Sequence, residues 1–334
     1  MSRIPTSPPE IPALEDQSNR PLWSVMIPAY NCSDYLIETL ESVLAQDLGA
    51  DRMQIEVIDD ASTDTDVEAL VKQIGKGRVT YHRQRENVGS LRNFETCLNR
   101  ARGHLVHLLH GDDRVLKGFY LKFTELFDQF PEAGAAFCRY QYIDMRGKRT
   151  SIRDTEMEKE GLLDNWLLRI AHKNRLQYVN MVVKRSVYER LGGFYGVTYG
   201  EDWEMWVRIA RDYPVIYTPD ILAEYRNHFG SISSDKLLTG QALRDIRTVM
   251  QFIEQYVPED KKKQVMQQAR LFWAIYGIRA AREVWRLTRS YKSTHSQVLE
   301  ALQLNSSSIQ VHLRILKLYL KIALETVKPP PSLS

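Results

Sequence analysis

The sequence predicts an α/β fold with a mostly parallel sheet flanked by helices, followed by a helical C-terminal extension. Short apolar segments alternate with amphipathic helical segments through residues 23–110, and helical patterning continues almost without interruption through residues 240–328. Strands that alternate with helices form right-handed βαβ units, and these units build parallel sheets. A chain of 334 residues can hold one large α/β domain and an appendage.

The first strand is expected at residues 23–31, WSVMIPAYN, because it is a short apolar run closed by a proline and an asparagine. Ser33 or Asp34 can then cap a helix whose apolar residues fall on one face. Asp64 or Asp66 is the expected start of the second helix. The alternation continues with strands at residues 53–62, 79–84 and 104–110, and with helices at residues 64–74 and 90–101.

Beyond residue 115 the pattern becomes less regular. The expected elements are a helix near residues 117–130, a strand and turn at 133–147, a helix at 164–175, a strand and helix over 176–194, a helix at 200–213, and a strand followed by a polar loop over 215–233. Residues 1–20 are rich in proline and polar residues, which predicts a disordered leader. We therefore expect an α/β domain at residues 21–239 and a helical extension at residues 240–334.

The formal net charge of +3 is unevenly distributed along the chain. Residues 241–334 hold 15 Lys and Arg against 7 Asp and Glu, a net +8, which leaves −5 for the first 240 residues. An acidic body suits a bound cation, and a basic tail suits an anionic surface.

The cysteines and the hydropathy pattern exclude several classes of protein. Cys32, Cys97 and Cys138 are odd in number and lack CxxC spacing, which argues against a disulfide framework or a zinc site. The sequence contains no secretory signal pattern and no run of 18 apolar residues. We expect a cytoplasmic protein.

Polar residues follow three of the predicted strands at the point where each strand ends. They are Tyr30 and Asn31, Asp59 and Asp60, and Asp112 and Asp113. Ligands of parallel sheets bind outside the carboxyl ends of the strands, so these residues should converge on one crevice. Adjacent carboxylates are costly to bury without a cation, and Mg²⁺ or Mn²⁺ needs only one or two protein carboxylates when substrate phosphates supply further ligands. The alternative for a single Asp pair is an ordinary cap or turn.

Four segments resemble the family 2 glycosyltransferases, which have the Rossmann-like GT-A fold. These segments are SVMIPAYNCSDYLIETLESVLAQ, EVIDDASTDTD, RENVGSLRNFETCLNRARGHLVHLLHGDD and YGEDWEMWVRIA, and the resemblance covers roughly residues 23–235. It implies transfer of a single sugar, with inversion, from a nucleotide-diphosphate sugar to the hydroxyl of a saccharide or lipid-linked acceptor. UDP is the expected carrier, and cell-surface polysaccharide or glycolipid synthesis is the expected process. The chain lacks the QxxRW motif of processive synthases.

The resemblance implies a role for several residues in binding the donor. They are Pro28, Ala29, Tyr30, Asp60, Gly89, Arg92, Asn93 and Asp112. Tyr30 would hold the base, Asp60 would accept a hydrogen bond from the base imide, and Arg92 would offer donors to phosphate.

The resemblance also implies a metal site and a general base. Asp112 and Asp113 match the DXD motif, one directed to the ribose and the other to Mn²⁺ or Mg²⁺, with His228 as a further ligand. His110 stands where many relatives have an acid, and an ordinary loop histidine is the alternative for it. Asp202 would take the acceptor's proton, with Glu201 beside it; helix capping by both acids is the alternative.

The C-terminal extension carries basic and apolar residues on separate faces of its expected last helix. The apolar residues are Ile309, Leu313, Leu316, Leu320 and Leu324, and the basic residues are Arg314, Lys317, Lys321 and Lys328. Such a helix can lie on the anionic inner face of the plasma membrane as part of a peripheral protein. Packing on the catalytic domain or on another subunit is the alternative.

Two rival functions fit the sequence less well. A nucleotidyltransferase would carry a Gly- and Lys/Arg-rich phosphate loop after the first strand, where this chain has PAYNCSDY. A nucleic-acid-binding module would carry a recognisable binding motif with interleaved aromatic residues. We expect a nucleotide-sugar donor and no nucleic-acid partner.

Overall fold

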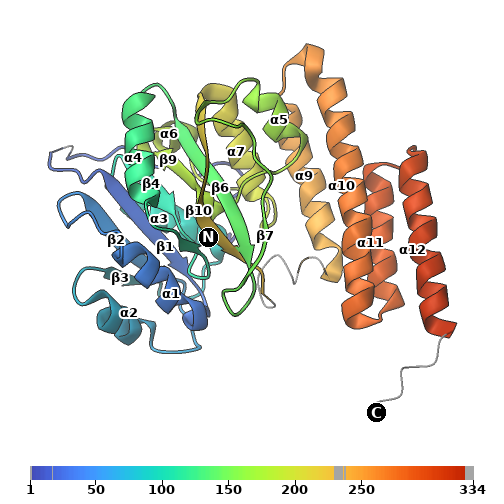
Figure 1. The fold of residues 1–334 in the computed structure, drawn as a ribbon, viewed down its shortest axis with the longest axis horizontal. Coiled ribbons are helices and arrows are strands. Elements are labelled where there is room, and N and C mark those ends of the chain that lie inside the picture. The colour runs from blue at the N-terminus through green and yellow to red at the C-terminus, as the bar shows by residue number, and fades with distance from the viewer. Residues whose placement is uncertain (1, 17, 229–235, 237, 328–334) are drawn as a thin grey trace. The chain divides into compact units, whose positions relative to one another are not determined.

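The computed structural model describes residues 2–16, 18–228, 236 and 238–327, and it divides the chain into two compact units (Figure 1). One unit comprises Met1–Leu167 and Arg175–His228, and the other comprises Leu168–Asn174 and Phe229–Ser334. The units are described separately below.

The first unit is built on a mixed sheet. Its strands within the described residues are β1 (Trp23–Ala29), β2 (Met53–Asp59), β3 (Thr80–Arg83), β4 (Leu105–Leu108), β5 (Arg114–Val115), β6 (Ala135–Ile143), β7 (Arg149–Ile152), β8 (Gly161–Leu162), β9 (Met181–Lys184) and β10 (Val215–Arg226). The order across the sheet is β3-β2-β1-β4-β9-β6-β10-β5, with β7 paired to β6 and β8 paired to β10. The strand pairs from β3 to β4 are parallel, and β9 runs antiparallel between β4 and β6. The predicted α/β fold class is confirmed.

Helices flank this sheet. They are α1 (Ser33–Leu44), α2 (Val67–Gly75), α3 (Ser90–Arg100), α4 (Phe119–Gln129), α6 (Arg185–Leu191), α7 (Glu201–Asp212) and the 3₁₀ turn η1 (Tyr178–Asn180). The residues of α5 (Trp166–His172) from Leu168 onward are assigned to the second unit. All seven residues of β1 are buried, as expected for a strand covered on both faces. Val25 and Ile27 of β1 pack in one core with residues of α1, α2 and α4. Helix α3 contacts β1, β2 and β4.

The start of α1 differs from the prediction. Neither Ser33 nor Asp34 caps this helix; Cys32 is at the N-cap without a side-chain cap, and the carboxylate of Asp64 accepts from the Ser33 backbone N–H at 3.0 Å. Asp66, one of the two predicted residues, caps α2 by accepting from the Ala69 N–H at 3.0 Å. Asp64 therefore joins the loop after β2 to the loop after β1.

Residues 2–16, here called the N-terminal arm, pack on the first unit although their composition predicts disorder. Carbonyl groups of three prolines in the arm accept hydrogen bonds: Pro5 from Gly196 N at 2.8 Å, Pro9 from Gly193 N at 2.8 Å and Pro12 from Arg185 Nη2 at 2.9 Å. Ile11 is 1% exposed. Because proline restricts the unfolded chain, ordering such a segment costs less entropy than its composition suggests.

The second unit contains α9 (Gln241–Glu254), α10 (Glu259–Thr288), α11 (Tyr291–Leu304) and α12 (Ile309–Val327). Helix α10 contacts the other three helices. Among the described residues, no helix combines the length and the apolar character needed to cross a lipid bilayer. The strand predicted within residues 215–233 is β10, which ends at Arg226, and the last residues of the predicted polar loop, together with Lys328, lie outside the described residues.

His107 of β4 should make folding stability depend on pH. Its buried ring nitrogens face the Val179 carbonyl oxygen at 3.0 Å and the Tyr120 hydroxyl at 3.4 Å, and burial lowers its pKa from 6.5 to about 3. Between these values the unfolded chain binds a proton that the folded chain excludes. The contribution of His107 therefore falls on acidification, by up to about 1.4 kcal/mol per pH unit.

We expect His107→Gln to flatten the dependence of the free energy of unfolding on pH between about pH 6.5 and pH 4.5. Urea denaturation at several pH values measures this slope. His312→Gln is the control, since His312 is exposed on α12. Equal slopes for His107→Gln and wild type would contradict the assignment.

Candidate active site

The carboxyl ends of β1, β2 and β4 meet at one edge of the sheet, as the sequence predicts. The parallel register pairs Ala29 with Asp59, and the Asp60 N–H donates to the Ala29 carbonyl oxygen at 2.9 Å. The Gly111 N–H donates to the Pro28 carbonyl oxygen at 3.2 Å. Pro28 and Ala29 are buried in β1, whereas Tyr30 is 50% exposed. The ring of Tyr30 is therefore accessible to a ligand at this edge.

Asp59 and Asp60 hold different parts of the loops at this edge. Asp59 is fully buried, accepts from the Tyr81 hydroxyl at 2.7 Å and pairs with Arg83 at 2.5 Å. The two carboxylate oxygens of Asp60 accept from the Val88 and Gly89 N–H groups at 2.8 and 2.9 Å. Burial raises the pKa of Asp60, against the effect of these hydrogen bonds. Because each carboxylate oxygen has two acceptor positions, Asp60 can still accept a hydrogen bond from a ligand.

The predicted residues of α3 differ in their accessibility. Gly89 precedes the helix with φ of 89°, a conformation that favours glycine. Asn93 is buried and donates to the Ile58 carbonyl oxygen at 2.9 Å, so its side chain joins α3 to β2. Arg92 is half-buried, pairs with Glu95 at 2.5 Å and donates from Nε to the Ser2 carbonyl oxygen at 2.9 Å.

The adjacent aspartates Asp112 and Asp113 occupy different environments. Asp113 is 2% exposed, and its Oδ1 accepts from the backbone N–H of Arg226 at 2.8 Å. Asp112 is more accessible, and its Oδ2 lies 2.9 Å from His228 Nε2. Burial and the charge of Asp112 raise the pKa of Asp113 well above its usual range. Burial also acts to raise the pKa of Asp112, but the hydrogen bond to His228 and the nearby histidines hold it below its usual value.

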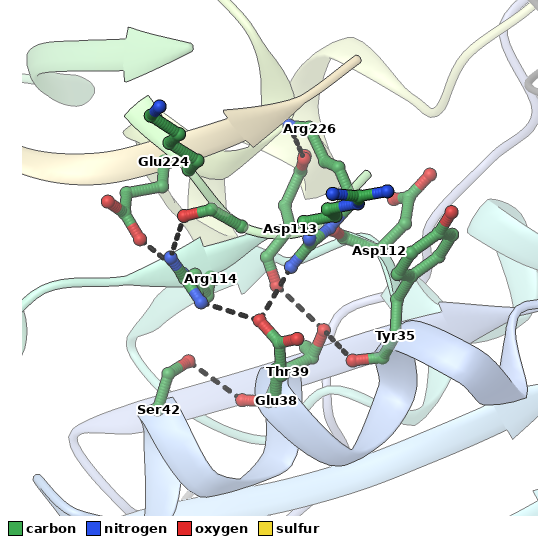
Figure 2. Close-up of polar contacts among 12 residues, drawn as sticks. Tyr35, Glu38, Thr39, Ser42, Asp112, Asp113, Arg114, Glu224 and Arg226 are labelled. Carbon is green, nitrogen blue, oxygen red and sulfur yellow. Dashed lines mark hydrogen bonds and ion pairs between the residues drawn. The ribbon is translucent and has the colours of Figure 1, made fainter. Parts of the chain in front are cut away.

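Arg226 connects the turn after β4 to β10 and α1. Its buried guanidinium donates to the Asp112 carbonyl oxygen and to Glu38 Oε2, each at 2.8 Å, and lies 4.7 Å from the centre of the Tyr35 ring. Figure 2 shows Arg114 between Glu38 and Glu224, with ion pairs to both. Burial acts to raise the pKa of Glu38, yet the two arginines hold it below its usual range.

Sequence reasoning missed Glu38 and Arg114 because each is an ordinary charged residue, one in a helix and the other in a two-residue strand. Their partners lie up to 188 positions away, so no local pattern could have indicated them.

Two predicted ligands suit a divalent cation. Asp112 and His228 place a carboxylate oxygen and an imidazole nitrogen 2.9 Å apart, which are donors that Mn²⁺ accepts. Within the described residues, no group of three or more His, Cys, Asp or Glu side chains could hold a metal. Mg²⁺ and Mn²⁺ sites in phosphate-binding enzymes often take one or two protein ligands and complete their shell with substrate and water, so this pair fits such an ion.

Glu201 and Asp202 are the first residues of α7, after Gly200 with φ of 88°. Both are 8% exposed, and their charges lie at the helix N-terminus, which favours anions. The Tyr178 hydroxyl donates to Glu201 Oε1 at 3.1 Å, and the Trp203 N–H donates to Asp202 Oδ1 at 2.7 Å.

His110, which precedes Asp112 and Asp113 in the chain, belongs to a cluster of aromatic rings that extends toward Glu201. Its ring lies 4.3 Å from the Tyr178 ring and 5.2 Å from the Phe94 ring. Burial lowers the pKa of His110 and favours the neutral ring. His110 thus fills the space between α3 and η1, and Tyr178 extends the contact to Glu201. An acid at position 110 would bring a charge into this stack.

Comparisons with known proteins agree with this architecture. The structure superposes on that of S. aureus TarS in complex with UDP-GlcNAc with a TM-score of 0.66, at 18% identity over 90% of this chain and 89% of that one. It also superposes on a mannosyltransferase of Pyrobaculum calidifontis in complex with GDP-Man and Mn²⁺ with a TM-score of 0.51, at 18% identity over 96% and 90% of the chains. Both likenesses confirm the GT-A fold.

Sequence comparison identifies the family. The chain is 26% identical, over 64% of its length and 81% of the relative's, to the Escherichia coli protein UDP-Glc:alpha-D-GlcNAc-diphosphoundecaprenol beta-1,3-glucosyltransferase WfaP. The family model described as glycosyl transferase family 2 matches residues 24–192, about half of the chain. The chain is therefore a glycosyltransferase and belongs to glycosyl transferase family 2.

Proposed function

We propose that this chain is an inverting transferase that moves a single sugar from a UDP-linked donor to the hydroxyl of a saccharide or lipid-linked acceptor. The observation that carries the proposal is the pairing of Asp112 with His228 at the sheet edge that also presents Tyr30 and Asp60. The names of WfaP and the TarS complex, which specify UDP-Glc, a diphosphoundecaprenol acceptor and UDP-GlcNAc, support the choice of donor and acceptor. Cell-surface polysaccharide or glycolipid synthesis is the process that we infer.

We assign the chemistry to residues 21–239 and regard residues 240–334 as an extension. In the donor site, the exposed Tyr30 ring would lie against the base, Asp60 would accept its imide N–H, and Arg92 would offer donors to phosphate. Asn93 and Gly89 would act by holding α3 and its first turn in place. Pro28 and Ala29 would supply backbone at the floor of this site.

Asp112 and His228 would hold Mn²⁺ or Mg²⁺, and the ion would offset the charge that develops on the leaving diphosphate. Asp113, also predicted as a ligand, faces the Arg226 N–H in the buried layer below. We propose that Asp113 acts by fixing the turn that presents Asp112.

Asp202 would act as the general base. Its carboxylate takes the proton of the acceptor hydroxyl as that oxygen bonds to the anomeric carbon and the bond from this carbon to the diphosphate oxygen breaks. Attack opposite the leaving group inverts the anomeric configuration. Glu201, held by the Tyr178 hydroxyl, would orient the acceptor or Asp202.

We expect Mn²⁺ to tighten UDP binding to the wild-type protein, and Asp112→Asn or His228→Ala to remove most of that difference. Calorimetry with Mn²⁺ and with EDTA measures it. Asp113→Asn keeps an oxygen acceptor for the Arg226 N–H, so it should retain the metal dependence while losing about 1–3 kcal/mol of stability. Asp51→Asn, at an exposed turn, is the control. UDP affinity that is identical with Mn²⁺ and EDTA in wild type would refute the metal proposal.

We expect Asp202→Asn to lower kcat by roughly 10²–10⁴-fold with little change in UDP affinity, because the amide cannot accept the proton. Glu201→Gln should cost less. If Asp202 merely caps α7, the opposite result is expected: a loss of stability of about 1 kcal/mol with nearly normal kcat. Turnover and melting temperature of the same samples separate the two roles.

We also propose that α12 lies on an anionic membrane that presents the acceptor. Its five predicted apolar residues are 53–76% exposed, with Lys317 and Lys321 exposed beside them. Each basic residue near an anionic surface contributes about 1 kcal/mol. This location accords with the lipid-diphosphate acceptor in the name of WfaP.

The double variants Leu316→Gln with Leu320→Gln, and Lys317→Gln with Lys321→Gln, should both weaken binding to phosphatidylglycerol-containing vesicles in flotation. Two lysines near the surface together contribute about 2 kcal/mol of binding free energy, so the lysine variant should bind the vesicles roughly 30-fold more weakly. Leu121→Gln, another exposed leucine, is the control. A different result would indicate that this face is a subunit interface. In that case the wild-type protein does not bind vesicles, and light scattering shows that it is an oligomer while the leucine variant is not.

A further inference from the structure

We propose that Arg3 of the N-terminal arm is a specificity-determining residue of the donor pocket, which together with Asp60 selects bases that carry an imide N–H beside a carbonyl group. This inference rests on the proposed nucleotide-sugar donor. It adds to that site a residue from outside the α/β core of the first unit.

Arg3 lies against the loop that Asp60 orders. A Cβ atom built on Gly89 would lie 3.1 Å from Arg3 Nε and 3.5 Å from Nη2, so the guanidinium occupies the space that a side chain at position 89 would fill. Arg3 Nη2 also donates to the Asn87 side chain. The charge of Arg3 acts on the Asp60 carboxyl and favours its ionised form. The guanidinium of Arg3 therefore lies next to Gly89, whose N–H is bound by the Asp60 carboxylate.

The position of Arg3 is fixed from both sides. On one side, the Ser2 carbonyl oxygen accepts from Arg92 Nε at 2.9 Å. On the other, the Pro5 carbonyl oxygen accepts from the Gly196 N–H at 2.8 Å. The guanidinium is thus delivered by an anchored backbone, and less entropy is lost when it binds a ligand.

The course of the arm explains why Arg3 reaches this edge of the sheet. Pro12 is bound by Arg185, whose N–H donates to the His104 carbonyl oxygen beside the amino end of β4. Ser2 is bound by Arg92 in the first turn of α3, at the carboxyl edge. The arm therefore runs between the two edges, and Ser2 and Arg3 lie at the start of α3, beside the loop that binds Asp60.

The chemistry of this pair matches one class of base. The imide N–H of uracil lies between two carbonyl groups, and guanine has an N–H beside a carbonyl group as well. Asp60 can accept the N–H while the guanidinium, which carries five N–H donors, donates to the neighbouring carbonyl oxygen. Cytosine and adenine present an unprotonated ring nitrogen beside an amino group, so both contacts would be reversed in polarity. Because polar groups of the site would then be left unpaired, we expect strong discrimination against CDP and ADP.

Calorimetry of the full-length protein with UDP, GDP, CDP and ADP in the presence of Mn²⁺ tests the proposal. Arg3→Ala should weaken UDP binding on the order of 10–100-fold, the effect expected from a hydrogen bond to a charged group, and should reduce the preference for UDP over CDP. Arg3→Lys should retain part of the affinity. Arg52→Ala removes an exposed arginine at the start of β2 and should bind like wild type.

The outcomes are distinguishable. Wild type that binds none of the four nucleotides overturns the proposed function and this inference together. Wild type that binds UDP while Arg3→Ala binds it equally well, with the same preference over CDP, overturns the inference alone. Tighter binding by Arg3→Ala would also overturn it, because the arm would then compete with the nucleotide. Arg3 is exposed, so melting temperatures should stay equal across the variants.

Discussion

The contact between Asp113 and Arg226 is the constraint on which the site depends. β4 and β10 are not neighbours in the sheet, but β5, which begins directly after Asp113, pairs with the last residues of β10. The Asp113 carboxylate accepts the Arg226 N–H, while the Arg226 guanidinium returns a hydrogen bond to the Asp112 carbonyl oxygen. These reciprocal bonds hold the turn after β4 against the end of β10, and they bring Asp112 and His228 within 2.9 Å. The backbone donor and the charge of Arg226 offset only part of the cost of burying the Asp113 carboxyl group beside Asp112, which is why its pKa is raised.

Adjacent acids at this edge of the sheet have different surroundings. Successive residues at a strand end point in different directions, so Asp113 faces the protein interior while Asp112 is more accessible. Asp113 and Asp59 are bound by Arg226 and by Arg83, respectively, whereas Asp112 stays more accessible. In the proposed site, Asp112 is thus the candidate metal ligand, and Asp113 holds the turn that presents it.

The predictable features are those that repeat along the chain or follow from a strand direction. The strand–helix alternation and the convergence of polar residues at one edge required only local patterns and the rule for parallel sheets. The antiparallel β9, the capping of α1 by Asp64, the pairing of Glu38 with Arg226 and the stacking of His110 all depend on residues distant in sequence. The composition of residues 1–20 predicts disorder because these residues are mostly polar or proline and offer few apolar side chains to bury. The order of the N-terminal arm comes instead from proline carbonyl groups that accept hydrogen bonds from a glycine-rich loop.

The arm also contacts two loops on different sides of the candidate site. Its Arg3 end touches the loop of Asn87 and Gly89 beside the donor residues, and its Pro5 and Pro9 carbonyl groups bind the glycine-rich loop that leads into α7. That loop determines where Asp202 stands, since α7 begins directly after Gly200. A displacement of the arm must therefore change hydrogen bonds on both sides at once. The bonds to the glycine-rich loop join backbone atoms, whereas those beside α3 use the side chains of Arg3 and Arg92. One segment therefore couples the proposed donor side to the proposed acceptor side through a rigid contact at one end and an adaptable one at the other.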